Sequence, residues 1–490
     1  MLFNSWQYAV FLPLVTFCYW LLPHKYRWVL LLCASYYFYM SWNANLVVLI
    51  LTTTGTSYGA ALAIDAAKTP RGRKLWLTLG VGVSAALLFF FKYFNFFSAS
   101  VCALLRAVSL PVGDFTLQVL LPVGISFYTF QTLSYVIDVY RGQLAPERNF
   151  GIYALYVSFF PQLVAGPIER AVNLLPQFRV EHRPDAGQFA WGLRSICLGL
   201  FKKVVVADYV APFVNAVFDD PNGCGPMAYV IGALLFSVQI YGDFSGYSDI
   251  ARGSAQLLGF SLMENFRAPY LARSVKEFWR RWHISLSTWF SDYIYIPLGG
   301  SRVSRAKHLR NLMVTFLLSG LWHGARWTFV LWGAAHGLLL CADVFWLPRR
   351  ERLTARWPAA ARHAAAAAET LVTFGLVTLL WILFRANSLA DAATIFVRLP
   401  WALSAPVQGV QVALQTIGLS GAALVRIALS LALLAAFDAV QRFAGEPFAL
   451  LRRQKAPVRI AVSYGLALCV LLALFTMPEQ VAVEFIYFQF

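Results

Sequence analysis

The chain has 490 residues, of which 59% are hydrophobic and only 13% are charged, and its mean hydropathy is +0.62. Soluble domains are about 45–50% apolar and about 25% charged, so this composition argues against a string of soluble domains. The net charge of +17 could indicate nucleic-acid binding, but the basic residues cluster in short segments between apolar runs. That pattern is typical of loops beside lipid headgroups, so we expect membrane lipids and no nucleic acid as partners.

Uncharged runs predict the membrane helices, because about 20 mostly apolar residues are needed to cross the hydrocarbon core. The first apolar stretch, 8–22, is expected to be a retained span, since nothing basic precedes it and no cleavage motif follows. The uncharged run 28–64 is too long for one span, and 42–45 is a natural place for it to turn. Later uncharged runs cover 75–91, 115–137, 151–168, 221–242, 399–425 and 460–478.

These runs predict an all-α polytopic membrane protein with roughly 10–12 membrane helices, some short or re-entrant, around a polar central cavity. We expect a single membrane domain over 1–490. Within it, 261–310 is a candidate cytoplasmic or re-entrant amphipathic segment, and 349–369 is a candidate connecting loop with an alanine-rich part. The 7 cysteines form no C-x-x-C pair and lie mostly in apolar runs, so we expect no disulfide framework.

The middle of the chain, from about 239 to 337, carries polar residues that a bilayer normally excludes. Asp243 and Asp249 stand near the end of an apolar run. They could bind a substrate or order a cavity, or they could hydrogen-bond neighbouring helices, which is the more common role of such residues.

A tryptophan-rich stretch follows, and its apolar residues recur at the spacing of one amphipathic helix. This stripe comprises Trp279, Trp282, Leu286 and Trp289. Arg280 and Arg281 lie beside it. Arginine forks bind phosphates and indole faces stack on flat groups, which would suit a nucleotide-bearing donor such as a coenzyme. The alternative is a set of interface tryptophans with snorkelling arginines.

Histidines occur in the apolar stretch 312–342, which contains Trp322-His323-Gly324 and His336-Gly337. A histidine can act as a general base near neutral pH, although it could instead be hydrogen-bonded within a helix bundle. The adjacent glycines would let a substrate or a helix approach closely. The sequence contains no H-x-x-x-H metal spacing, no G-x-S-x-G elbow and no P-loop, so no metal site is expected.

Several separated blocks together resemble the membrane-bound O-acyltransferase (MBOAT) family. The blocks 278–289 (FWRRWHISLSTW) and 292–300 (DYIYIPLGG) look like its signature. The block 320–325 (GLWHGA), followed by 331–337, is similar to the region that holds the family's catalytic histidine. Further matching blocks at 121–128, 137–142, 160–168, 241–249 and 383–386 are similar to the branch of the bacterial alginate O-acetyltransferase membrane subunit.

The resemblance implies transfer of an acyl group from a thioester donor, acetyl-CoA, to a hydroxyl, with no bound cofactor. His323 matches the family's catalytic histidine and would be the general base. His283 matches a second recurrent histidine, which would orient the donor or polarise the thioester carbonyl. The predicted substrate-binding residues are Arg280, Arg281 and Trp282 near the donor entrance, together with Trp322 and Asp243.

The resemblance also implies a place in the bacterial inner membrane and an extracytoplasmic polysaccharide acceptor such as alginate. A separate periplasmic acetyltransferase subunit would complete the transfer. The same blocks occur in proteins that O-acetylate peptidoglycan or cellulose, and in more distant ones that D-alanylate teichoic acid, so the acceptor stays open. A transporter or flippase would explain the intramembrane Asp243, Asp249 and Arg385 but not the tryptophan, arginine and histidine block. A scaffold for a periplasmic enzyme is the third possibility.

Overall fold

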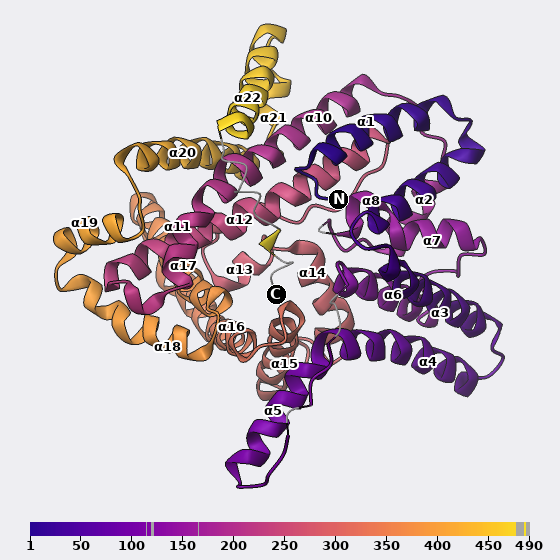
Figure 1. The fold of residues 1–490 in the computed structure, drawn as a ribbon, viewed down its shortest axis with the longest axis horizontal. Helices are drawn as coiled ribbons and strands as arrows, with labels where there is room; N and C mark the ends of the chain where they lie inside the picture. Colours follow the sequence, from indigo (N-terminus) through magenta and orange to yellow (C-terminus); the bar gives the residue numbers. More distant parts are fainter. Residues whose placement is uncertain (114, 119–121, 165, 477–484, 487–490) are drawn as a thin grey trace. The chain divides into compact units, whose positions relative to one another are not determined.

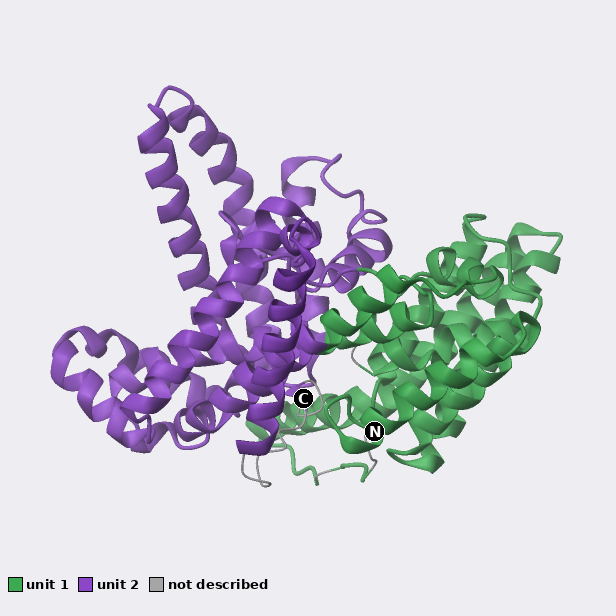
Figure 2. Cartoon of the chain, turned by 90° about the horizontal axis from the view of Figure 1, so that it is seen from above, with its two compact units in different colours: residues 1–196, 247–263 green, residues 197–246, 264–490 purple. Residues whose placement is uncertain are grey.

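The computed structural model describes residues 1–113, 115–118, 122–164, 166–476 and 485–486, and every regular element among them is a helix (Figure 1). The chain divides into two compact units (Figure 2). Unit 1 contains residues 1–196 and 247–263, and unit 2 contains residues 197–246 and 264–490. Helices α10 (Ala186–Leu200) and α12 (Pro226–Leu257) each contribute residues to both units.

The other elements of unit 1 begin and end as follows: α1 (Trp6–Leu21), α2 (His24–Met40), η1 (Ala44–Leu46), α3 (Val47–Ala66), α4 (Pro70–Leu88), η2 (Phe89–Tyr93), α5 (Phe94–Ala107), α6 (Ile125–Tyr140), α7 (Phe150–Ser158), α8 (Phe160–Leu163), α9 (Ala171–Leu174) and η3 (Leu175–Phe178). The predicted turn at 42–45 lies between α2 and α3, where the side chain of Asn43 accepts a hydrogen bond from the backbone N–H of Asn45.

The elements of unit 2 are η4 (Phe201–Asp208), α11 (Tyr209–Phe218), η5 (Pro221–Gly223), η6 (Pro269–Leu271), α13 (Val275–Trp279), α14 (Ile284–Phe290), η7 (Ser291–Tyr295), α15 (Arg305–His323), α16 (Trp327–Thr354), α17 (Ala359–Arg385), α18 (Leu389–Arg398), η8 (Leu399–Leu403), α19 (Pro406–Thr416), α20 (Gly421–Ala444), α21 (Ala449–Arg452) and α22 (Ala456–Thr476). Three of the η elements, η2, η4 and η7, are π-helical.

The protein is an all-α, multi-pass membrane protein. Within the described residues, 7 helices are long and apolar enough to cross a bilayer. They are Ala44–Ala66, Pro70–Ala107, Pro226–Leu257, Trp327–Thr354, Ala359–Arg385, Gly421–Ala444 and Ala456–Thr476. Other apolar runs of the sequence form shorter helices, among them α1, α6 and α7.

The connection expected over 349–369 is shorter than its composition suggested. Helix α16 continues to Thr354 and α17 begins at Ala359, so only residues 355–358 lie between these helices. Alanine has the highest intrinsic helix propensity, and the alanine-rich run therefore extends α17 by several turns. The other proposed segment, 261–310, holds η6, α13, α14, η7 and the start of α15. Its placement as cytoplasmic or re-entrant stays a prediction.

The tryptophan stripe does not lie on one continuous helix, which corrects the expectation drawn from its spacing. Helix α13 ends at Trp279 and α14 begins at Ile284, with His283 between them in the left-handed region at φ 44°. All four members of the stripe are nevertheless buried. Both short helices turn their apolar residues inward. The helical spacing of these residues therefore persists across the break in the backbone, and the spacing alone does not reveal that break.

Candidate active site

His323 is the last residue of α15, and three residues, 324–326, connect α15 to α16. The side chain is buried, with 3% of its surface exposed. Its ring meets the indole of Trp332 at 5.0 Å and the ring of Phe384 at 5.3 Å, both edge-on. Aromatic walls of this kind restrict the orientation of an imidazole and exclude water around it.

Two glycines allow the hairpin of α15 and α16 to pack closely beside His323. A Cβ atom on Gly333 would lie 2.3 Å from the carbonyl oxygen of Phe316, and one on Gly320 would lie 2.3 Å from that of Phe329. No real Cβ tolerates such a distance, so only glycine permits this approach of the helices. The close approach therefore fixes where α15 presents His323.

His283 is held by a strained backbone and by a neighbouring loop. A non-glycine residue at positive φ costs about 1–3 kcal/mol and persists only where the surroundings enforce it. Here the carbonyl of Asn265 accepts a hydrogen bond from the N–H of Ile284 at 2.9 Å. The side-chain oxygen of Asn265 accepts from the N–H and the hydroxyl of Ser285, at 3.2 and 2.7 Å. Asn265 thus accepts hydrogen bonds from the first backbone N–H groups of α14, which have no partner within the helix, and fixes the turn that carries His283.

His283 is fully buried and uncharged at neutral pH. Its ring meets Phe244 of α12 edge-on, with centroids 4.6 Å apart, and also meets Trp322 at 6.0 Å. Burial lowers the pKa of His283 to about 3, because the apolar surroundings penalise the imidazolium ion. A neutral imidazole has one N–H donor and one acceptor nitrogen, so it can donate to a carbonyl oxygen without carrying charge.

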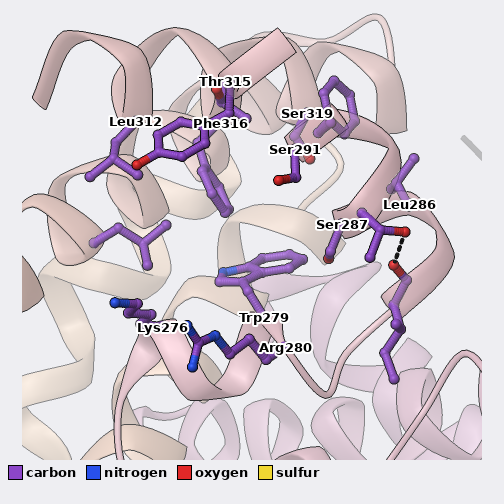
Figure 3. A pocket seen from close by; sticks show the side chains of 15 residues that line it. Lys276, Trp279, Arg280, Leu286, Ser287, Ser291, Leu312, Thr315, Phe316 and Ser319 are labelled. Atoms are coloured by element: carbon purple, nitrogen blue, oxygen red, sulfur yellow. Dashed lines mark hydrogen bonds between the residues drawn. The ribbon is translucent and has the colours of Figure 1, made fainter. Parts of the chain in front are cut away.

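A cavity of about 310 Å³ lies between α13, α14 and η7 on one wall and α15 with α16 on the other (Figure 3). Figure 3 shows the indole of Trp279 in this cavity, with Lys276 of the same helix and Arg280, which follows that helix, nearby and with Thr315 and Ser319 opposite. The remaining lining residues are Ile284, Leu286, Ser287, Thr288, Phe290, Ser291, Tyr295, Leu312, Phe316 and Leu340. The cavity is therefore mostly apolar, with hydroxyl groups along it and two exposed cations, a pattern typical of ligand sites.

The structure separates the predicted substrate-binding residues into two groups. Arg280 is exposed and lines the cavity. Arg281 instead forms an ion pair with Glu277 at 2.9 Å and donates to the carbonyl of Arg267. These contacts hold Arg281 against Glu277 and Arg267, and Arg281 does not line the cavity.

Trp282 and Trp322 are both buried and also lie outside the cavity wall. Trp282 packs on Trp381 of α17 at 5.0 Å, and Trp381 stacks on Trp332 at 5.9 Å. Trp322 contacts the rings of both His283 and His323. These tryptophans therefore shape the surroundings of the histidines.

Asp243 belongs to a buried charge cluster. Its Oδ1 atom lies 2.7 Å from Nζ of Lys203, which also contacts Asp208 at 2.7 Å. Its Oδ2 atom accepts a hydrogen bond from the backbone N–H of Ile486 at 2.7 Å. Protein groups thus engage both oxygens, and this supports the alternative in which Asp243 orders the interior.

Two small polar residues of α15, Thr315 and Ser319, line the cavity, and neither was predicted from the sequence. Asn311, Thr315 and Ser319 precede His323 at intervals of four, and all four side chains are buried. Residues at this spacing share one helix face. A row of small polar residues in an apolar helix was therefore a readable signal for the cavity. Lys276 and Asn265, by contrast, carried no such periodic signal.

No group of three or more His, Cys, Asp or Glu side chains that could hold a metal ion occurs among the residues described. His283 and His323 are instead surrounded by aromatic rings. Both imidazoles contact the indole of Trp322.

The model of the MBOAT, membrane-bound O-acyltransferase family, matches residues 148–375 of the chain. The protein named "Probable alginate O-acetylase AlgI" in Azotobacter vinelandii is 42% identical over 81% of this chain and 78% of its own length. Its namesake in Pseudomonas aeruginosa is also 42% identical, over 78% of this chain and 71% of that protein. The peptidoglycan O-acetyltransferase of Helicobacter pylori is 36% identical, over 74% of this chain and 71% of its own length.

Proposed function

Because the chain belongs to the membrane-bound O-acyltransferase family and is an O-acyltransferase, we propose that it transfers an acetyl group from cytoplasmic acetyl-CoA toward hydroxyls of an extracytoplasmic polysaccharide such as alginate. In this proposal His323 is the general base, and the inner membrane of a bacterium is the place of the reaction. The donor occupies the cavity beside Trp279.

The observation that carries the proposal is a cavity lined by two exposed cations and by Ser319, which lies one helical turn before the buried His323. Neither His323 nor His283 lines this cavity. Lys276 and Arg280 supply positive charge where the phosphates of a coenzyme would bind, and the hydroxyls of Thr315 and Ser319 suit its amide groups. Ser319 lies one helical turn before His323 on the same face of α15. A thioester that enters this cavity is thereby directed toward the buried imidazole.

The basic segments support a cytoplasmic side for the donor. The cluster 302–310 surrounds the start of α15, and the basic segment 349–362 surrounds the end of α16. The positive-inside rule assigns both to the cytoplasm. Lys276 is held near the same end of the hairpin, because its backbone N–H bonds to Asp343 of α16 at 2.8 Å. His323, at the opposite end of α15, then faces the side from which the acceptor arrives.

The proposed reaction uses both histidines. A nitrogen of His323 takes the proton of the acceptor hydroxyl, and the hydroxyl oxygen attacks the thioester carbonyl carbon. Neutral His283 donates its N–H to the oxygen that becomes negative in the tetrahedral intermediate. The C–S bond then breaks, and the coenzyme leaves as a thiolate that receives the proton from His323. The products are the acetyl ester and free coenzyme A.

The experiment measures acetyl consumption by membranes that contain the protein, supplied with acetyl-labelled acetyl-CoA. We expect His323→Ala to lose activity, and we expect His363→Ala, which changes an exposed histidine of α17, to keep it. Both variants are compared at equal protein level. Full activity of His323→Ala would exclude this residue as the base. Label that crosses the membrane without release of coenzyme A would indicate a transporter.

The acceptor and the partner need a second assay. We propose that the hydroxyl acetylated at His323 belongs to an intermediate acceptor, from which a separate periplasmic acetyltransferase passes the acetyl group to alginate. The likeness to the Helicobacter pylori enzyme favours peptidoglycan as the second candidate acceptor. Purified alginate and peptidoglycan are therefore offered in parallel with a periplasmic extract of the source cells. Ester formed on alginate supports the first proposal, and ester formed only on peptidoglycan replaces it with the second.

A further inference from the structure

We propose that His336 is a positioning residue whose Nδ1 atom holds the Trp279 indole in the wall of the donor cavity, an inference that rests on the proposed function. His336 lies on α16 and is fully buried. It does not line the cavity, whereas Trp279 does. His336 can therefore act on the donor only through residues of the cavity wall, and its hydrogen bond joins it to Trp279.

One hydrogen bond joins the two residues. Nε1 of Trp279 donates to Nδ1 of His336 at 3.2 Å, and the two rings meet edge-on with centroids 5.0 Å apart. Trp279 is the last residue of α13, a helix of only 5 residues. Such a short helix has little stability of its own, so its final side chain depends on tertiary contacts for a fixed orientation. His336 supplies a directional one.

The surroundings of His336 leave its ring little freedom. Trp332 meets it edge-on at 4.8 Å, and the rings of Phe316 and Phe278 lie at 6.3 and 6.5 Å. Phe316 also lines the cavity, opposite Trp279. The histidine therefore sits in a rigid aromatic frame that transmits its position to the cavity wall.

The hydrogen-bond direction fixes the protonation of His336. Nδ1 can accept only if the ring is neutral and the proton is on Nε2. That Nε2 atom is buried and has no hydrogen-bond partner among the described residues. A buried N–H without an acceptor costs stability, which a leucine at this position would avoid. The cost is consistent with a role for the acceptor at Nδ1.

The test separates positioning from chemistry through the kinetics of His336→Leu and His336→Asn with acetyl-CoA. Leucine removes the acceptor, whereas the amide oxygen of asparagine can replace Nδ1. We expect His336→Leu to raise the KM for acetyl-CoA about tenfold with kcat nearly unchanged, and His336→Asn to restore much of the affinity. An unchanged KM in His336→Leu, or a fall of kcat alone in both variants, would overturn the proposal.

A double-mutant cycle tests the contact itself. Trp279→Phe keeps an aromatic ring but removes the N–H donor, so His336→Leu should change the KM little further in that background. The same double-mutant cycle can be measured as the thermal stability of the purified protein, and this measurement requires no acetyl-CoA. There we expect Trp279→Phe to suppress most of the effect of His336→Leu on Tm, and additive effects would overturn the proposal. If wild-type membranes do not consume acetyl-CoA, the proposed function fails and the Tm cycle still decides the contact.

Discussion

The imidazole of His283 meets the indole of Trp322 at 65°, with the two ring centroids 6.0 Å apart. Trp322 directly precedes His323 in the chain, and its ring lies 5.0 Å from that imidazole. One side chain therefore contacts both candidate catalytic histidines, which come from segments far apart in sequence. We infer that Trp322 sets their relative position.

Replacement of Trp322 tests this role. Trp322→Phe keeps an aromatic surface between the histidines and should retain a substantial share of acetyl transfer. Trp322→Ala leaves a buried cavity, which costs about 3–5 kcal/mol, and should lose both activity and stability. The measurements are acetyl-CoA consumption at equal protein level and Tm in detergent. Trp357→Ala removes an exposed indole and is the control. Equal activity of Trp322→Ala and the wild type would contradict the inference.

Asn265 should matter for activity beyond its effect on stability. Asn265→Ala removes the acceptor of the N–H and hydroxyl of Ser285 and releases the turn at His283. Loss of such a cap costs about 0.5–2 kcal/mol, and we expect acetyl transfer to fall as well. Asn149→Ala removes a comparable cap, which accepts from Gly151 and Ile152 at the start of α7.

The two caps form a matched pair, because each side chain accepts two hydrogen bonds at the start of a helix, and Asn149 belongs to unit 1 whereas Asn265 belongs to unit 2 with His283 and His323. Both alanine variants should lower Tm in detergent by similar amounts. Only Asn265→Ala should lower the rate of acetyl-CoA consumption. A similar rate in the two variants would show that Asn265 contributes stability alone.

Gly333 provides a test of helix spacing at the site. Gly333→Ala places a Cβ 2.3 Å from the carbonyl oxygen of Phe316, so α15 and α16 must separate and His323 must move. We expect a fall in acetyl transfer and an overpacking cost of about 1–3 kcal/mol in stability. Gly375→Ala in α17 is the matched control, since nothing lies within 4 Å of the new Cβ and alanine favours the helix. If both variants behave alike, the close approach has no functional role.

The buried charge cluster of Lys203, Asp208 and Asp243 should be needed for stable folding. Lys203→Met leaves Asp208 and Asp243 buried without their cation, and breaking such a pair typically costs about 3–5 kcal/mol. We expect little folded protein on size-exclusion chromatography in detergent. Adding Asp208→Asn and Asp243→Asn removes the uncompensated charges and should restore part of the yield.

Arg148→Met gives the exposed comparison, because it breaks the surface ion pair with Asp65. Exposed pairs contribute about 0–1 kcal/mol, so this variant should remain folded like the wild type. A wild-type yield for Lys203→Met would contradict a structural role of the cluster. If the triple variant, which combines Lys203→Met with Asp208→Asn and Asp243→Asn, gives no more folded protein than Lys203→Met alone, then packing at the cluster limits folding more than its charge does.

The pH dependence of stability follows from the lowered pKa of His283. This pKa is about 3 in the folded protein, against 6.5 for an unperturbed histidine. As pH falls through 6.5 the unfolded chain binds a proton that the folded protein does not, so stability decreases with falling pH. Between about pH 8 and about pH 5 the loss from this one residue is about 2 kcal/mol.

The decrease in Tm over this pH interval should therefore be smaller in His283→Gln than in the wild type. His363→Gln, which changes an exposed histidine, should show the wild-type decrease. Other buried histidines contribute equally to all three proteins and cancel in the comparison. An identical decrease in His283→Gln and the wild type would mean that this imidazole is accessible to protons in the folded protein.

The histidines and their neighbours could be predicted from sequence because the membrane penalises polar groups. A histidine within an apolar stretch, such as His323, stands out against its surroundings, and the resemblance of the blocks at 278–289 and 320–325 added the chemistry. The cavity wall was only partly predicted. Arg280 does line the cavity, whereas the adjacent Arg281 pairs with Glu277. Both arginines lie in the turn after α13, where the direction of a side chain cannot be derived from helical spacing.

By itself the sequence determined that this is a multi-pass helical membrane protein of the O-acyltransferase family, because hydrophobic length and local motifs are properties of contiguous residues. Only the tertiary structure decided that the tryptophan stripe breaks at His283, that Trp322 joins His283 to His323, and that Asp243 is engaged by Lys203. These features depend on long-range contacts and on one residue at positive φ. Neither leaves a periodic signal in the chain, so no reading of spacing could have supplied them.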